Sequence, residues 1–104
     1  PDTAESIGDD AFFGCDNLRS VTFGRRMESI GMQAFMGCRS LEEIAMPERL
    51  TEIKPSTFYG CEGLTKITLG GVKKIGKNAF WGCDSLEPVD TSGIEVAAGN
   101  DALK

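Results

Sequence analysis

The 104-residue chain contains no histidine, one tryptophan and one tyrosine. Without histidine it lacks the side chain that most often serves as a general base and as a neutral metal ligand. No apolar run reaches the length that a membrane-spanning helix requires. Acidic residues outnumber basic ones by 16 to 11, and nucleic-acid binding would need clustered Lys and Arg instead. The sequence therefore indicates a small acidic domain that has no histidine to act as a general base or metal ligand.

Internal repetition dominates what is present. The pentads AFFGC, AFMGC, TFYGC and AFWGC contain all four cysteines, which follow one another at intervals of 23, 23 and 22 residues. Leucine and isoleucine or valine recur with the same period, as in Leu18, Leu41, Leu64 and Leu86. A fixed period of this length is the signature of a repeat array, so each recurring position defines a column of equivalent residues.

Each unit has an interpretable local pattern. The segment LEEIAM (41–46) alternates apolar and outward positions, which predicts a short strand, and a turn with Pro or Gly follows. A second extended piece leads to the next isoleucine. The segment after it, such as GMQAFMG (31–37), is predicted to form one short helical turn that ends at a glycine with positive φ.

One unit cannot bury its apolar residues alone, whereas units stacked in register share a core with about 4.8 Å between strands. The sequence therefore predicts a repeat solenoid in the α/β class, mostly β, with about four repeats. We place one repeat domain at residues 1–96 and a decayed, truncated end at residues 97–104. Because the first residue is Pro1 rather than Met, we expect either a processed chain or an excerpt of a longer protein. The units lie near residues 7–29, 30–52, 53–74 and 75–96.

The unit IGMQAFMGCRSLEEIAMPERLTEI resembles the BspA-like, or treponemal-type, leucine-rich repeats, which read roughly I-G-x-x-A-F-x-G-C-x-x-L-x-x-I-x-L-P-x-x-L. The resemblance covers about residues 1–96 and departs from the pattern at Lys54–Pro55 and after Val89. It implies a right-handed coil with a short parallel sheet on its concave side. It also implies a bacterial cell-surface or secreted protein, often adhesive, from a family not known for catalysis.

The cysteines allow several chemical interpretations. Stacked cysteines would have parallel Cβ vectors, which disfavours disulfides, and no C-x-x-C pair or histidine supports a zinc site. A nucleophilic cysteine would need a base, and no histidine can supply one. We therefore expect a column of buried free thiols, with no catalytic residue, metal or cofactor.

Two surface columns are candidates for partner binding. Outward positions of the concave strands are small and mixed in charge, which is equally typical of a solvated sheet face. Large apolar residues between Phe and Gly of each pentad predict either an exposed binding stripe or a column packed on itself. The candidate concave contacts are Ser20, Thr22, Glu43, Lys66, Thr68 and Asp90. The candidate stripe is Phe13, Met36, Tyr59 and Trp81.

The leading interpretation is a non-catalytic surface module that binds a protein or glycan. The alternative is a structural spacer of a larger secreted protein whose activity lies in another domain. In either case the ends of the array expose apolar residues, near Ile7 and Val89, without a polar capping repeat. We therefore also expect end-to-end self-association.

Overall fold

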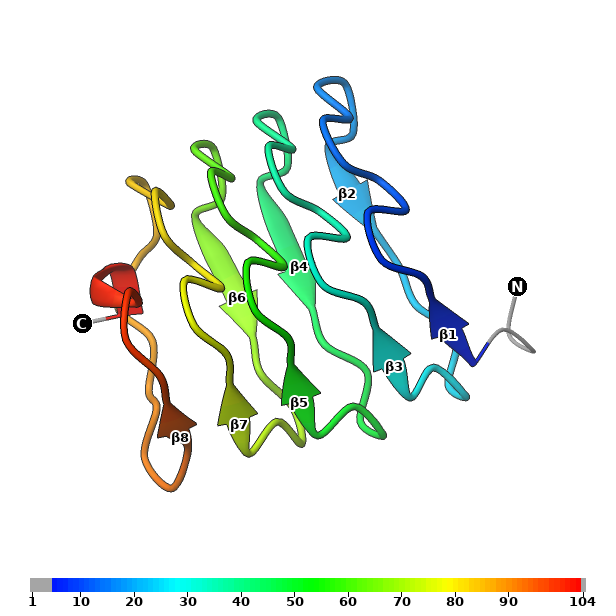
Figure 1. Cartoon of the computed structure of the whole chain (residues 1–104), viewed down its shortest axis with the longest axis vertical. Coiled ribbons are helices and arrows are strands. Elements are labelled where there is room, and N and C mark those ends of the chain that lie inside the picture. The colour runs from blue at the N-terminus through cyan, green and yellow to red at the C-terminus, as the bar shows by residue number, and fades with distance from the viewer. Residues whose placement is uncertain (1–4, 104) are drawn as a thin grey trace.

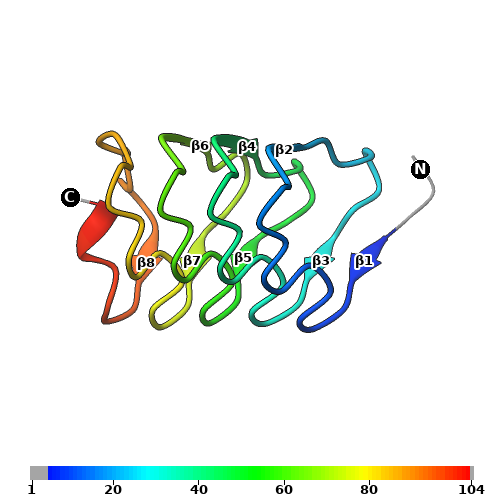
Figure 2. The same ribbon diagram turned by 90° about the horizontal axis from the view of Figure 1, so that it is seen from above.

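The computed structural model describes residues 5–103, which form a stack of coils joined by short parallel strands. Two rows of strands run across the coils, one on each side of the stack (Figures 1 and 2). The first row comprises β1 (Ser6–Ile7), β3 (Ser29–Ile30), β5 (Glu52–Ile53), β7 (Lys74–Ile75) and β8 (Glu95–Val96). The second row comprises β2 (Ser20–Val21), β4 (Glu43–Ala45) and β6 (Lys66–Thr68).

The strand register reproduces the period of the sequence. In the sheet β2-β4-β6, Val21 pairs with Ile44 and Ile44 with Ile67. In the sheet β5-β7-β8, Ile53 pairs with Ile75. Equivalent residues of successive repeats thus lie side by side, which confirms that the sequence columns become columns in space. Within residues 5–103 the single helical element is η1 (Asp101–Leu103), and no helix there is suited to crossing a membrane.

The segments before each cysteine do not form the expected helical turns. Residues 9–14, 32–37, 55–60 and 77–82 are runs of consecutive turns. Every second amide donates to a carbonyl three residues back in the same segment, as Phe13 N does to Asp10 O. The amides between these donate to the next coil, as Phe12 N does to Ala34 O at 2.8 Å. An α-helix would need each amide to donate four residues back, so bonding between coils replaces it. The expected positive φ is confirmed at Gly14, Gly37, Gly60 and Gly82.

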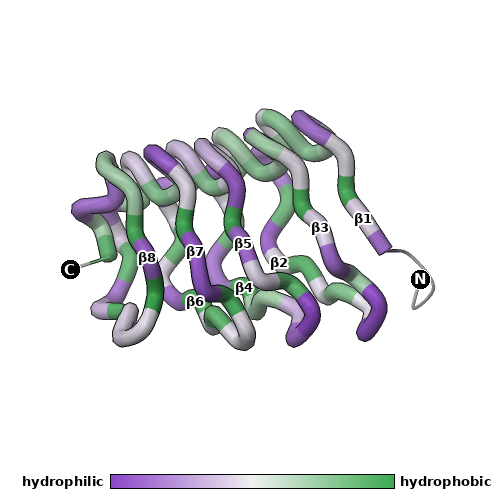
Figure 3. The backbone as a smooth tube through the Cα atoms, turned by 60° about the horizontal axis from the view of Figure 1, so that its bottom comes forward, coloured by the Kyte–Doolittle hydropathy of each residue, from purple (hydrophilic) through white to green (hydrophobic). Residues whose placement is uncertain are grey.

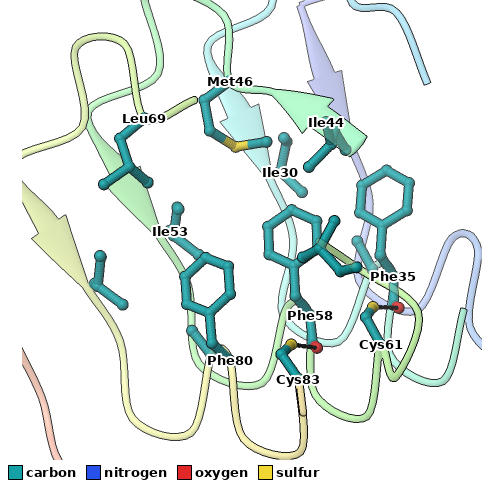
Figure 4. Packing of buried hydrophobic residues seen from close by; sticks show 14 of the residues in the cluster. Ile30, Phe35, Ile44, Met46, Ile53, Phe58, Cys61, Leu69, Phe80 and Cys83 are labelled. Carbon is teal, nitrogen blue, oxygen red and sulfur yellow. Dashed lines mark hydrogen bonds between the residues drawn. The ribbon is translucent and has the colours of Figure 1, made fainter. Parts of the chain in front are cut away.

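The core consists of side-chain columns that cross the coils. The rings of Phe12, Phe35, Phe58 and Phe80 stack nearly parallel, with centroids 5.3, 5.5 and 5.3 Å apart. Phe35, Phe58 and Phe80 lie in a row beneath the isoleucines of the strands (Figure 4). Apolar positions recur at matching places in successive coils (Figure 3). Stacking therefore buries in common what no single coil could bury alone.

The first row of strands is interrupted between β3 and β5, which belong to separate sheets. The interruption coincides with Lys54–Pro55, which replace the Gly-x pair of the other coils. Gly31 is the equivalent of Lys54 in the preceding coil. A Cβ at Gly31 would lie 2.5 Å from the backbone nitrogen of Asp9, so glycine permits the second coil to approach the first closely. Thr57 bridges the interrupted site, because its buried hydroxyl donates to Lys54 O at 2.7 Å and lies 3.4 Å from Gly31 O.

The two ends of the stack differ. In the first coil Phe12 is 36% exposed and Cys15 is half-buried, so the expectation of a column of buried thiols is wrong at Cys15. Among residues 5–103 the first coil has a neighbouring coil on one side only, which is the physical reason. At the other end η1 covers the core with Leu103, which is 5% exposed.

The C-terminal end is also closed by hydrogen bonds from one buried side chain. The amide oxygen of Asn100 accepts from Phe80 N at 2.9 Å, and its nitrogen donates to Gly76 O at 3.0 Å and Ala97 O at 2.8 Å. In the preceding coils, the amide equivalent to Phe80 N donates to a backbone carbonyl, as Phe58 N does to Ala79 O. The side-chain oxygen of Asn100 therefore replaces the backbone carbonyl that accepts the equivalent hydrogen bond in the preceding coils.

Candidate binding surfaces

The cysteine column is arranged for packing. The thiol of Cys61 donates to Phe35 O at 3.1 Å, and that of Cys83 donates to Phe58 O at 3.2 Å (Figure 4). All four cysteines are free. Burial raises the pKa of the Cys61 thiol far above its ordinary value and that of Cys83 to about 12. A thiol with so high a pKa is a poor nucleophile, because the thiolate is the reactive form.

The acidic side chains do not gather into a metal site. Among residues 5–103, no group of three or more His, Cys, Asp or Glu side chains is placed to hold a metal ion. Glu42 and Asp84 belong to different coils, as the repeat period requires.

The second strand row presents a continuous exposed face. The backbone register places Ser20 beside Glu43 and Glu43 beside Lys66, and all three side chains are exposed. Thr22, Ala45 and Thr68 are exposed at the next outward position. Inward residues between them pack on the core, so the backbone beneath this face is held in place by buried side chains. This arrangement brings together five of the six candidate concave contacts.

Asp90, the sixth candidate, does not lie on a strand. Its coil passes the second row without forming one, because Pro88 stands where a strand residue would supply an amide donor. Instead the hydroxyl and the amide of Ser92 donate to the Asp90 carboxylate at 2.6 and 2.9 Å. These hydrogen bonds hold the pKa of Asp90 below its ordinary value. The Asp90 side chain therefore stabilises a local turn.

A shallow depression of about 590 Å³ lies beside this face, between the turns that follow β2 and β4. Phe23 and Met46 contribute apolar surface to it, and Arg25 and Arg49 contribute positive charge. The Arg49 guanidinium lies 3.5 Å from Glu28, and both side chains are exposed. This depression was not predicted from the sequence. The only signal for it was that the residues of the turn differ from one repeat to the next.

The aromatic stripe is divided between exposure and packing. Phe13 and Trp81 at its ends are 54% and 52% exposed, while Met36 and Tyr59 between them are half-buried. The rings of Tyr59 and Trp81 stack with centroids 4.7 Å apart. Tyr59 and Trp81 therefore pack on one another while Phe13 and Trp81 remain open to solvent, and the binding role of the column stays a prediction.

A second depression of about 560 Å³ adjoins the exposed end of the stripe. Trp81, Asp84, Gly99 and Asp101 are among the residues that line it. Sequence reasoning identified Trp81 but not its surroundings, because Gly99 and Asp101 lie outside the regular repeat. Only the path of residues 97–103 brings them beside the indole.

The comparison with protein families agrees with the repeat. A family sequence model described as BspA type Leucine rich repeat region (6 copies) matches residues 1–100. No curated protein matches the chain.

Two solved structures are similar in fold and in sequence. A leucine-rich repeat protein of T. pallidum superposes with a TM-score of 0.77 at 29% identity, over 84% of this chain and 41% of that one. A leucine-rich repeat protein from Bacteroides ovatus ATCC 8483 also gives 0.77, at 28% identity, over 91% of this chain and 28% of that one. The chain thus spans less than half the length of either protein.

Proposed function

Because the chain belongs to the BspA-type leucine-rich repeat family, we propose that it is a non-catalytic protein-binding module of a bacterial cell-surface or secreted adhesive protein. In this proposal residues 1–96 form a right-handed solenoid and residues 97–104 its terminal segment. The sheet β2-β4-β6 is its concave, partner-facing side.

One observation carries the proposal. The outward side chains of β2, β4 and β6 form an exposed face of mixed charge over a backbone secured by the core. Glu43 and Lys66 are cross-strand neighbours on it, and such a pair offers both signs of charge to a partner. Protein interfaces depend on this kind of electrostatic complementarity for selecting partners and fixing register.

The first row of strands supplies a matched control for a test. Glu52 of β5 and Lys74 of β7 are cross-strand neighbours, just as Glu43 and Lys66 are in the second row. Swapping the charges in either pair keeps the net charge and the type of pairing. The variants Glu43→Lys/Lys66→Glu and Glu52→Lys/Lys74→Glu therefore make the same residue exchange on the two faces. Lys74→Glu also removes an opposite charge from beside Glu95 of β8, so the folded state of each variant is checked by circular dichroism.

The measurement is retention of proteins from a solubilised extracellular-matrix extract on each immobilised variant, followed by interferometry of each retained protein after purification. We expect the swap in the second row to weaken binding about tenfold and the swap in the first row to leave it unchanged. Retention no greater than on a blank surface would refute the proposal and favour the spacer interpretation. Equal effects of the two swaps would refute the assignment of the face.

A further inference from the structure

The side chain of Trp81 has an unusual environment for an exposed aromatic residue. One side of its indole is stacked on Tyr59, with an interplanar angle of 17°, while 52% of the residue remains exposed. Tyr59 belongs to the preceding coil, whereas Gly99 and Asp101 belong to the chain that follows. The depression that Gly99 and Asp101 line therefore lies on the side of the indole away from Tyr59.

This depression combines an aromatic wall with acceptor groups. Its volume of about 560 Å³ falls within the usual range of small-ligand sites. The acidic residues Asp84 and Asp101 line it, and none of the described residues that line it is basic. Gly82 and Gly99, both with positive φ, also line it.

We propose that this depression binds a neutral saccharide, with one pyranose ring stacked on the free side of Trp81. An aromatic ring has a negative face, which attracts the C–H groups on the apolar side of a sugar. Sugar hydroxyls donate to carboxylates in charge-assisted hydrogen bonds, which are stronger than neutral ones. Stacking on Tyr59 holds the indole in position before binding, so little side-chain entropy is lost.

The negative charge around the depression disfavours anionic glycans. Two carboxylates at the border, within a chain of net charge −5, repel sialylated or sulfated saccharides. The site lies apart from the strand face of the proposed function and goes beyond it, since each can bind without the other. Changes at Trp81 and at the Glu43–Lys66 pair therefore give distinguishable outcomes.

The intrinsic fluorescence of the protein offers a direct test, because Trp81 is the only tryptophan. The probes are maltotriose, cellotriose, mannotriose and chitotriose, with sialyllactose and a heparin tetrasaccharide as anionic comparisons. We expect at least one neutral trisaccharide to cause a saturable change in emission and the anionic probes to cause none. Calorimetry with the best probe then supplies the dissociation constant for comparing variants.

Trp81→Ala is expected to weaken binding at least about tenfold and Asp84→Ala about fivefold, both measured by calorimetry. Trp81→Phe, which retains stacking on Tyr59, is expected to bind with intermediate affinity and serves if Trp81→Ala does not fold. Phe13→Ala is the matched control, because Phe13 is equally exposed in the same column at the opposite end. It should leave the affinity unchanged.

Absence of a saturable response to all four neutral probes, up to about 20 mM, would overturn the proposal. So would an affinity that survives Trp81→Ala, or one that Phe13→Ala reduces as much. Preferential binding of the anionic probes would also overturn it, since the carboxylates at the border could not favour them.

Discussion

Phe12 and Phe58 are the same residue in the same column of the repeat, yet Phe12 is 36% exposed and Phe58 is fully buried. Both rings stack on Phe35, one from each side. Phe58 has a second ring, Phe80, on its other side, and no described residue occupies the equivalent place beside Phe12. In a stacked array, burial is thus a property of the neighbours, and an identical side chain contributes differently at the end and in the middle.

Truncating the two phenylalanines measures that difference most directly. We expect Phe58→Ala to lower the free energy of unfolding by about 3–5 kcal/mol, because it leaves a cavity in the packed column. Phe12→Ala should cost less than half as much, because solvent already reaches the ring and the cavity is open. Urea unfolding followed by circular dichroism gives both values. Equal losses would mean that the first coil is covered in solution.

The closed end is tested by removing the side chain that closes it. Asn100→Ala leaves Phe80 N and Ala97 O without their hydrogen-bond partner, while Gly76 O still accepts from Ala79 N, and this should cost about 1–3 kcal/mol. Hydrogen exchange should accelerate at Phe80 N while the amide of Phe35 stays protected. Asn17→Ala, an exposed residue of the first coil, serves as the control and should change neither quantity. Unchanged exchange at Phe80 would contradict the closing role of Asn100.

The thiols extend the comparison to pH. The folded-state pKa of Cys83, about 12, lies above the ordinary value of 9.0, so folding disfavours its thiolate. The corresponding stability is fully present below pH 9.0 and is lost as the pH rises toward 12. Between pH 8 and pH 10 we expect Cys83→Ala to lose roughly 1 kcal/mol less stability than the parent chain, because burial also raises the pKa values of Cys38 and Cys61 and these thiols keep their own contributions.

Cys15, which is half-buried, provides the internal contrast for that experiment. A thiol-reactive dye at neutral pH should label it in the folded protein, while the other three cysteines react only after unfolding. Rapid labelling of all four thiols in the native state would contradict the buried column. An identical pH dependence in the parent chain and Cys83→Ala would show that Cys83 does not cause the alkaline loss.

The smallest expected effect is weak self-association through the open end. The exposed edge around Phe12 has apolar surface that a second copy can cover, whereas Leu103 lies within the closed end. Light scattering from micromolar to millimolar concentration should show a rising mean mass for the parent chain and a constant one for Phe12→Glu. Trp81→Glu, a change at another exposed aromatic, should behave like the parent. A constant mass for the parent chain would contradict the expectation.

The sequence predicted the repeated features well because they depend on spacing. The period that separates Ile30 from Ile53 and Ile75 carried over to rows of parallel strands, and glycine at the left-handed positions needed only local backbone sterics. The expected helical turns were wrong because amides such as Phe12 N find a partner in the next coil. The local sequence pattern could not show whether such an amide would donate within its own turn or to the next coil.

The candidate surfaces were predicted in part. Glu43 and Lys66 were placed correctly on one strand face, because alternation along a strand determines which side chains point outward. Asp90 lies outside the strands, since Pro88 cannot donate to the strand ladder and Ser92 donates two hydrogen bonds to the Asp90 carboxylate. The depression beside Trp81 was not predicted at all.

By itself the sequence determined the columns, because residues 22 or 23 positions apart must meet when equivalent coils stack in register. It also determined where the backbone turns left-handed. Only the tertiary structure decided which members of a column are dry and how the array closes. Those outcomes depend on what lies next to a coil: Asn100 can stand in for a neighbouring carbonyl, and Trp81 can keep one side open, only through the particular path of the last residues.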